Sequence, residues 1–372
     1  MGGVVIAGFG ASEILRKTDR SITDLSVEAI RRALADACIS ADDVDGYVGA
    51  PFATNAGSPH AEGGDEISLK TIAATLNLPL TYGADLFRRY PTDMVSFAAN
   101  ALSAANSRFV LGLRAMYNLP GLSYATSSYA TSGADQAFGN DQFTKPFGFT
   151  TAGARFGTRA QRYMATHGAT RADLYEVVAL ARRHAANNPD AVWRDRSVRL
   201  DDYLAAPMIA TPHGLLDCDM PVCGAMAFVM CRAADLPAGA AAARVTGWSG
   251  FTTPNAVFET SGRSAADVTQ AQLYDGFSSM IWEWLEGFGL CPPGSAWSFI
   301  RDGHGNADGR LPLNTFGGSL GEGRMHGMGH LREAYLQATG KAGARQQAGV
   351  GPILVHNGPF DDSSFLMIEP EA

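Results

Sequence analysis

Several features are missing from this chain of 372 residues, and each absence argues against a class of protein. No apolar run approaches the ~18–20 residues that a membrane-spanning helix needs, so we expect no membrane association. The net charge is −8 and there is no basic run, which argues against nucleic-acid binding because such sites need a basic patch. The N-terminal MGGVVIAGFG has no basic segment and no cleavage site, so no secretion signal is expected and a cytoplasmic location is predicted.

Cysteine and cofactor motifs are also scarce. The five cysteines are odd in number and form no CxxC pair, so we expect neither a disulfide framework nor a zinc knuckle. There is no GxxxxGK[ST], and the one glycine-rich stretch does not follow a nucleotide-binding βαβ pattern, which makes ATP and NAD unexpected ligands. No HExxH or similar spacing indicates a metal. The sequence therefore predicts no metal and no bound cofactor.

Strand and helix patterns alternate along most of the chain. The predicted strands are Val4–Phe9, Asp45–Ala50, Phe109–Leu113, Ala225–Cys231, Val245–Gly250, Thr269–Tyr274, Ile353–His356 and Phe365–Ile368. The predicted helices are one capped by Thr23 or Asp24, then Ile67–Leu78, Thr92–Ala105, Gly153–Thr166, Arg171–Ala186 and Ile281–Phe288. This alternation predicts an α/β fold with helices on both faces of a sheet. Residues 120–149 show no period, and so long an irregular segment favours an insertion that covers a site.

Glycine is concentrated in Leu311–His330, LPLNTFGGSLGEGRMHGMGH. Within this stretch, residues 317–329 include six glycines among thirteen residues, and Arg324 and His326 lie among them. Glycine lets backbone N–H groups approach a ligand closely, and a turn that opens a helix favours negative charge. The stretch therefore predicts either a site for developing negative charge or a tight structural turn beneath a helix.

The segment NTFGGSLGEGRMHGMGH resembles the C-terminal signature of thiolases, N-x-x-G-G-x-x-x-x-G-H-P-x-G, in the form of the sterol-carrier and lipid-transfer branch. Other matching stretches follow in the same order and cover nearly the whole chain: Gly2–Gly8, His184–Pro189, Leu215–Val229, Leu273–Phe277 and VHNGP near the end. The resemblance implies a thiolase fold of two similar α/β halves in αβαβα layering. These halves would be residues 1–235, with a loop insertion at about 119–206, and residues 240–372.

Two departures from the family pattern concern its chemistry. Thiolases carry a nucleophilic cysteine at the start of the buried helix of the first half, but the matching segment here, from Arg88 to Asp93, has none. Thr92 is a poor substitute without an adjacent base. Where the family has the histidine of G-H-P, this chain has Arg324, which cannot act as a base but can hold an anion or an enolate. We therefore expect the acyl-enzyme mechanism to be lost.

The segment LYDGF at Leu273–Phe277 indicates a particular branch. Tyr-Asp-x-Phe resembles the lipid-transfer-type aldolases that act on steroid side-chain thioesters, whereas sterol-carrier-type thiolases have His-Asp-x-Phe. Those aldolases cleave a β-hydroxyacyl-CoA by a retro-aldol reaction with tyrosines and no cysteine. Tyr274 would be the base or proton shuttle if a cation such as Arg324 lowered its pKa. The branch's second tyrosine falls at the position of Arg324 here.

Other expected site residues lie on the same loops. His326 and His356 are predicted to be supporting acid/base or oxyanion groups. The predicted substrate-binding residues are Asn314, Gly317, Gly318 and Gly358, the last offering a backbone N–H to a thioester oxygen.

The expected function is cleavage of a C–C bond beside a CoA thioester, with coenzyme A present only as part of the acyl-CoA substrate. The resemblance also implies a homodimer and a small OB-fold, zinc-ribbon partner protein. Two alternatives stay open. One is a non-catalytic thiolase-like subunit of a complex, and the other is a Claisen-type acyltransferase that works with a partner.

Overall fold

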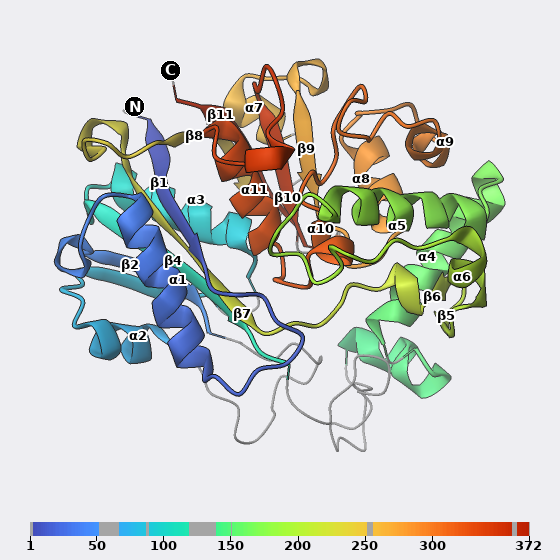
Figure 1. Ribbon diagram of the computed structural model, residues 1–372, viewed down its shortest axis with the longest axis horizontal. Helices are drawn as coiled ribbons and strands as arrows, with labels where there is room; N and C mark the ends of the chain where they lie inside the picture. The colour runs from blue at the N-terminus through green and yellow to red at the C-terminus, as the bar shows by residue number, and fades with distance from the viewer. Residues whose placement is uncertain are drawn as a thin grey trace.

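The computed structural model describes residues 3–51, 67–86, 89–118, 139–149, 151–250, 256–358 and 363–371. Its centre is a nine-stranded sheet of order β3-β2-β4-β7-β1-β8-β11-β10-β9 (Figure 1). The strands are β1 Val4–Ala11, β2 Gly46–Ala50, β3 Tyr82–Asp85, β4 Phe109–Met116, β7 Gly224–Arg232, β8 Ala243–Gly250, β9 Gln270–Leu273, β10 Ile353–Asn357 and β11 Ser364–Pro370. A separate pair contains β5 Met208–Ala210 and β6 His213–Gly214.

The strand order reads alike in both directions from the central antiparallel pair β1–β8. Outward from β1 it is β7, β4, β2, β3, and outward from β8 it is β11, β10, β9. In each half the first neighbour is antiparallel to the strands beside it, and β2 and β9 then pair in parallel with β4 and β10. The predicted α/β fold of two similar halves is therefore confirmed. No counterpart of β3 lies beyond β9 in the part of the chain that the structure describes.

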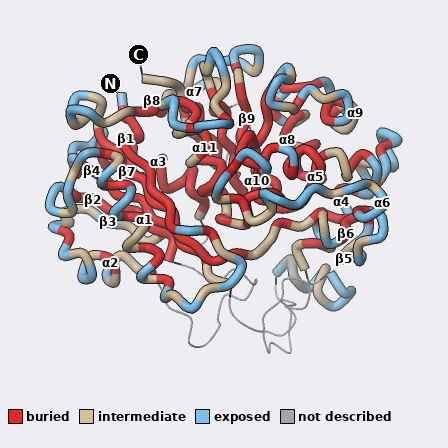
Figure 2. Tube along the Cα trace, viewed as in Figure 1, coloured by how far each residue is buried: buried red, intermediate tan, exposed pale blue. Residues whose placement is uncertain are grey.

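Eleven helices surround the sheet in the described ranges: α1 Ile22–Asp36, α2 Leu69–Leu76, α3 Pro91–Ser103, α4 Ala152–His167, α5 Arg171–Ala185, α6 Leu200–Ala205, α7 Ala256–Ser261, α8 Met280–Gly287, α9 Ala296–Arg301, α10 Gly318–Gly321 and α11 Met328–Ala338. Helices α3 and α11 share one apolar cluster with strands of both halves. They form the buried middle layer that Figure 2 shows in red. The small residues Ala98, Ala99 and Ala101 of α3 are buried there, because a helix covered on most sides leaves little room for side chains.

The chain between β4 and β7 belongs to the first half by sequence but packs on the second half. Phe156 of α4 and Leu174 of α5 share an apolar cluster with Leu273 and Trp282, and Figure 1 shows α4, α5 and α6 beside α8 and α9. This segment therefore covers the outer face of the second half.

The structure corrects two details of the sequence interpretation. Helix α1 is capped by Ser21, whose side chain accepts from the Asp24 N–H, and not by Thr23 or Asp24. Strand β3 was not predicted, because it is four residues long at the sheet edge and partly exposed. Of the predicted insertion at 120–149, residues 120–138 lie outside the described residues, and the division into 1–235 and 240–372 stays a prediction. None of the described helices is long and apolar enough to cross a membrane.

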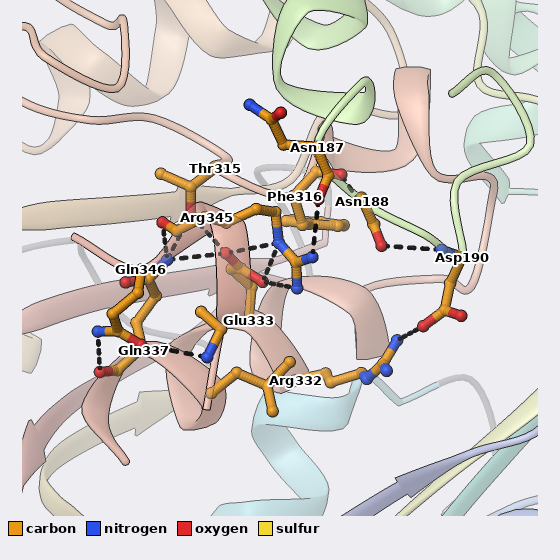
Figure 3. A network of polar contacts seen from close by, with 12 residues as sticks. Asn187, Asn188, Asp190, Thr315, Phe316, Arg332, Glu333, Gln337, Arg345 and Gln346 are labelled. Carbon is orange, nitrogen blue, oxygen red and sulfur yellow. Dashed lines mark hydrogen bonds and ion pairs between the residues drawn. The ribbon is translucent and has the colours of Figure 1, made fainter. Parts of the chain in front are cut away.

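A buried polar network holds α11 to the start of the glycine-rich stretch (Figure 3). Arg345 and Glu333 form an ion pair at 2.9 Å, with both side chains almost fully buried. Glu333 also accepts from the Thr315 hydroxyl at 2.8 Å and from the Gln337 amide at 3.0 Å. Arg345 donates to the carbonyl of Asn187, which follows α5. The network thus joins the segment after α5 to the start of the glycine-rich stretch, to α11 and to the chain that follows α11.

We expect Arg345→Met to lower the free energy of unfolding by about 3–5 kcal/mol, because Glu333 would remain as a buried charge without its partner. Urea unfolding measures the change. The matched control is Arg263→Met, which breaks the more exposed pair with Glu369 and should cost at most about 1 kcal/mol. Equal losses in the two variants would contradict a special role for the buried pair.

Candidate active site

Tyr274 directly follows β9, and its backbone is fixed from two sides. The side-chain amide of Asn314 accepts from the Leu273 N–H at 2.7 Å and donates to the Leu273 carbonyl at 2.8 Å. The indole N–H of Trp284 donates to the Tyr274 carbonyl at 2.9 Å. The Asn314 amide is therefore used on the end of β9. It positions Tyr274, and its substrate-binding role stays a prediction.

Arg324 meets Tyr274, as the sequence interpretation required. Its guanidinium donates a hydrogen bond to the tyrosine hydroxyl, and its Nε lies 3.3 Å from Oδ2 of Asp219. The effect on Tyr274 is nevertheless opposite to the expectation. Burial, and next the nearby Asp219 carboxylate, raise the pKa of Tyr274 to about 12, which outweighs the lowering by Arg324. Tyr274 is thus a protonated phenol near neutral pH.

His326 lies between tyrosines of the two halves. Its ring centre is 5.2 Å from that of Tyr90 and 6.2 Å from that of Tyr274. Burial, and then the charges of Arg114 and Arg324, hold the pKa of His326 well below its usual range. The imidazole is therefore neutral at physiological pH and is not a source of protons.

The first half contributes two residues that the sequence interpretation did not assign. Tyr90 caps α3, and its ring packs so closely on Gly358 that a Cβ there would lie 2.7 Å from the ring. Arg114 is buried at the end of β4 and donates to the Arg89 carbonyl at 3.1 Å. Burial, and then Arg324, lower the pKa of Arg114 to about 10, so it stays cationic. A single arginine within the apolar strand FVLGLRAM was the signal that sequence offered.

Six residues therefore converge, and we call them the inter-half cluster: Tyr90, Arg114, Asp219, Tyr274, Arg324 and His326. The cluster combines two arginines and one carboxyl with neutral phenol and imidazole rings. Such a set favours a negatively charged intermediate and offers groups that can exchange protons.

The glycine-rich turn holds an anion of the protein itself. The Asp275 carboxylate accepts from the N–H groups of Ser319 at 2.7 Å and Leu320 at 3.2 Å, and it contacts the His330 ring at 3.1 Å. A Cβ on Gly318 would collide with this carboxylate, and one on Gly317 would meet the backbone of Ala185. The donors of the turn are therefore occupied by Asp275. Gly317 and Gly318 therefore have a structural role in this turn, and their substrate binding stays a prediction.

His356 does not join the inter-half cluster. Its ring packs on Trp284 at 3.7 Å between centres and also contacts Phe288 and Phe365. Its β10 position is paired with Leu273 of β9, on the face that points into the apolar core. Burial, and then His330, hold its pKa well below the usual range. The predicted acid/base role for His356 therefore finds no support in its surroundings.

The cysteines give no indication of an acyl-enzyme. Burial raises the pKa of the thiols of Cys218 and Cys223, raises that of Cys231 to about 12 and raises that of Cys291 to about 11. A nucleophile needs the thiolate, which a raised pKa disfavours. Thr92 is buried and shares a hydrogen bond with the hydroxyl of Ser364.

The chain is similar to several known proteins. Residues 242–366 match the family described as "Thiolase C-terminal domain-like". The chain is 32% identical to the 17-hydroxy-3-oxo-4-pregnene-20-carboxyl-CoA lyase of Mycobacterium tuberculosis, over 99% of each chain. It is also 32% identical to the steroid side-chain-cleaving aldolase of Thermomonospora curvata, over 99% of this chain and 98% of that one. The solved Ltp2-ChsH2(DUF35) aldolase superposes with a TM-score of 0.85 at 29% identity, covering 99% of this chain and 98% of that chain.

We expect Gly318→Ala to destabilise the protein far more than Gly340→Ala. Both glycines have positive φ, 63° and 73°, which costs an alanine about 1–2 kcal/mol. Only at Gly318 would the new Cβ also displace the Asp275 carboxylate, because Gly340 has no neighbouring atom within 4 Å. Urea unfolding of both variants measures the difference, and equal losses would show that Asp275 does not depend on this close contact.

Proposed function

Because this chain belongs to the thiolase superfamily, in the branch of the steroid side-chain-cleaving aldolases, we propose that it is a carbon–carbon lyase acting on an acyl-CoA thioester. The reaction is the retro-aldol cleavage of a β-hydroxyacyl-CoA, without a cysteine acyl-enzyme. Its two relatives at 32% identity are named as a lyase of a carboxyl-CoA compound and as an aldolase, and each matches nearly the whole chain.

One structural observation carries the proposal. Tyr274 and Arg324 are in hydrogen-bond contact, and both lie with His326 at the junction of the two halves. Retro-aldol cleavage leaves its electron pair on the thioester as an enolate, so it needs cations and hydrogen-bond donors at that oxygen. It needs no nucleophile. This matches a site that lacks a reactive thiol but holds two arginines.

The groups can be assigned roles from their protonation. Arg324 donates to the oxygen of Tyr274, which leaves the phenolic hydrogen available for the thioester oxygen. Arg324 and Arg114 are the cations that stabilise the developing enolate. His326 is neutral and offers a ring nitrogen as an acceptor or donor for the substrate. The backbone N–H of Gly358, which lies beside Tyr90, is a further donor to the substrate.

We also propose that the enzyme works as a homodimer with a small OB-fold, zinc-ribbon partner. The similar solved structure is an aldolase complex that includes a DUF35 protein, which supports a partner of this kind. Coenzyme A enters only as part of the substrate. A partner that helps to bind the acyl-CoA should lower KM. It should leave the fold-loss of activity caused by substitutions in the inter-half cluster largely unchanged.

The test is incubation of the protein, with and without a DUF35 protein from the same genome, with a panel of β-hydroxyacyl-CoA thioesters. Mass spectrometry detects the shorter acyl-CoA and the carbonyl product. We expect Tyr274→Phe to reduce cleavage by about 100-fold or more, since it removes the hydrogen-bond donor to the enolate oxygen.

Tyr335→Phe is the matched control for this test. It removes a buried hydroxyl that donates to Asp36, at 2.6 Å, outside the inter-half cluster, and turnover should be unchanged. If no thioester is cleaved while the partner binds tightly, the chain is instead a non-catalytic thiolase-like subunit.

A further inference from the structure

Asp219 is an unusual carboxyl group. Its side chain is 1% exposed, and neither carboxyl oxygen has a hydrogen-bond partner among the described residues. The guanidinium of Arg324, 3.3 Å away at Nε, forms an ion pair with it. A buried carboxylate that lacks hydrogen bonds destabilises a fold. Such a group in a site therefore points to a chemical role.

The neighbouring carboxyls differ from Asp219 in this respect. Asp217 accepts from the hydroxyls of Tyr203 and Ser278 and from the Gly214 N–H. Asp275 accepts from the backbone of the glycine-rich turn. Both are fully engaged in holding the fold. Asp219 alone among these three keeps its oxygens available.

The backbone brings Asp219 to the Tyr274 hydroxyl. The Asp219 N–H donates to the carbonyl of Gly276 at 3.2 Å. The Tyr274 ring folds back over the same glycine, where a Cβ would lie 3.1 Å from the hydroxyl oxygen. Arg324 contacts both side chains. The Arg324 guanidinium therefore links the Asp219 carboxyl to the Tyr274 phenol, whose ring lies over Gly276.

The charges around Asp219 suit a group that exchanges protons near neutral pH. Burial raises its pKa to about 7, Arg324 opposes the rise, and the carboxylate of Asp275 adds to it. Tyr274 stays protonated, since its pKa is raised to about 12. His326 stays neutral, and Arg114, whose pKa is lowered to about 10, stays cationic. Among Asp219, Tyr274, His326 and Arg114, Asp219 is the group that changes charge between pH 6 and 8.

We propose that Asp219 is the general base of the cleavage and that Tyr274 is the hydrogen-bond donor to the enolate oxygen. This assignment rests on the proposed lyase function. Asp219 takes the proton of the β-hydroxyl, the C–O bond becomes a carbonyl and the Cα–Cβ bond breaks. The electron pair moves to the thioester as an enolate, whose oxygen accepts from the Tyr274 hydroxyl beside Arg324. After the carbonyl product leaves, Asp219 returns the proton to Cα, so no co-reactant is needed.

The pH dependence follows from this assignment. The reactive form of Asp219 is the carboxylate, so kcat/KM rises with pH and is lost as pH falls through about 7, the pKa of Asp219. A tyrosine base would instead place the rising limb toward the pKa of Tyr274, about 12. The position of this limb distinguishes the two bases.

The experiment is a pH–rate profile of the wild type with its partner, beside Asp219→Asn and Asp219→Glu, on the thioester that the panel identifies. We expect Asp219→Asn to lose about 100-fold or more of kcat/KM and its rising limb near neutral pH. Asp219→Glu should keep part of the rate with a displaced limb. A second readout is exchange of the Cα hydrogen of the shorter acyl-CoA in D₂O. Asp219→Asn should lose this exchange, and Asp219→Glu should keep part of it.

Glu283→Gln is the matched control. Glu283 is also a largely buried carboxyl whose pKa burial raises to about 7, and it is also paired with one arginine, Arg159, at 3.0 Å. It lies on α8 outside the inter-half cluster, and its variant should keep the wild-type limb. If the wild type cleaves but Asp219→Asn keeps its rate and limb, this assignment alone is overturned. If the wild type cleaves none of the panel, the lyase function itself fails.

Discussion

The carboxylate of Asp275 holds the second-half loops of the site together, and the rest of the site depends on that contact. It neutralises the start of α10 by accepting two backbone N–H groups and contacts His330 from the start of α11. Because Asp275 directly follows Tyr274, the contact also fixes where the tyrosine stands. Glycine is required beside it, since a Cβ on Gly318 would occupy the position of the carboxylate. The turn therefore stabilises a charge of the protein itself. The charge of the enolate is stabilised by the neighbouring inter-half cluster.

The inter-half cluster is assembled from both halves of the fold. Tyr90 and Arg114 come from the first half, while Tyr274, Arg324 and His326 come from the second. Helices α3 and α11 lie between the two sets of strands, so the ends of both helices reach the same junction. The buried ion pair of Arg345 with Glu333 holds α11 against the segment that follows α5. Polar contacts thus hold in place the elements that carry the inter-half cluster.

The balance of charge in the inter-half cluster decides what chemistry is possible. The buried Arg114 and the partly exposed Arg324 face one carboxyl, so the cluster has room for one more negative charge, as an enolate would supply. Burial, and then the charges of the same arginines, lower the pKa of His326 and keep it neutral. Burial, and next the Asp219 carboxylate, raise the pKa of Tyr274 and keep it protonated. Each group's protonation is therefore set first by burial and then by neighbouring charges, which separates a base, Asp219, from a hydrogen-bond donor, Tyr274.

The sequence by itself determined the α/β fold and the glycine-rich turn, because strand and helix periods and the spacing of glycines are local features. The resemblance of its motifs to those of thiolases implied the two halves. It also led to Tyr274 and Arg324, and to the loss of the cysteine beside Tyr90. Only the tertiary structure decided which groups share the site. His356 points into an aromatic core because the register of β10 against β9 sets its face. Asp219 and Arg114 enter the site because distant segments pack together. Burial, which no local pattern specifies, then set the protonation that assigns their roles.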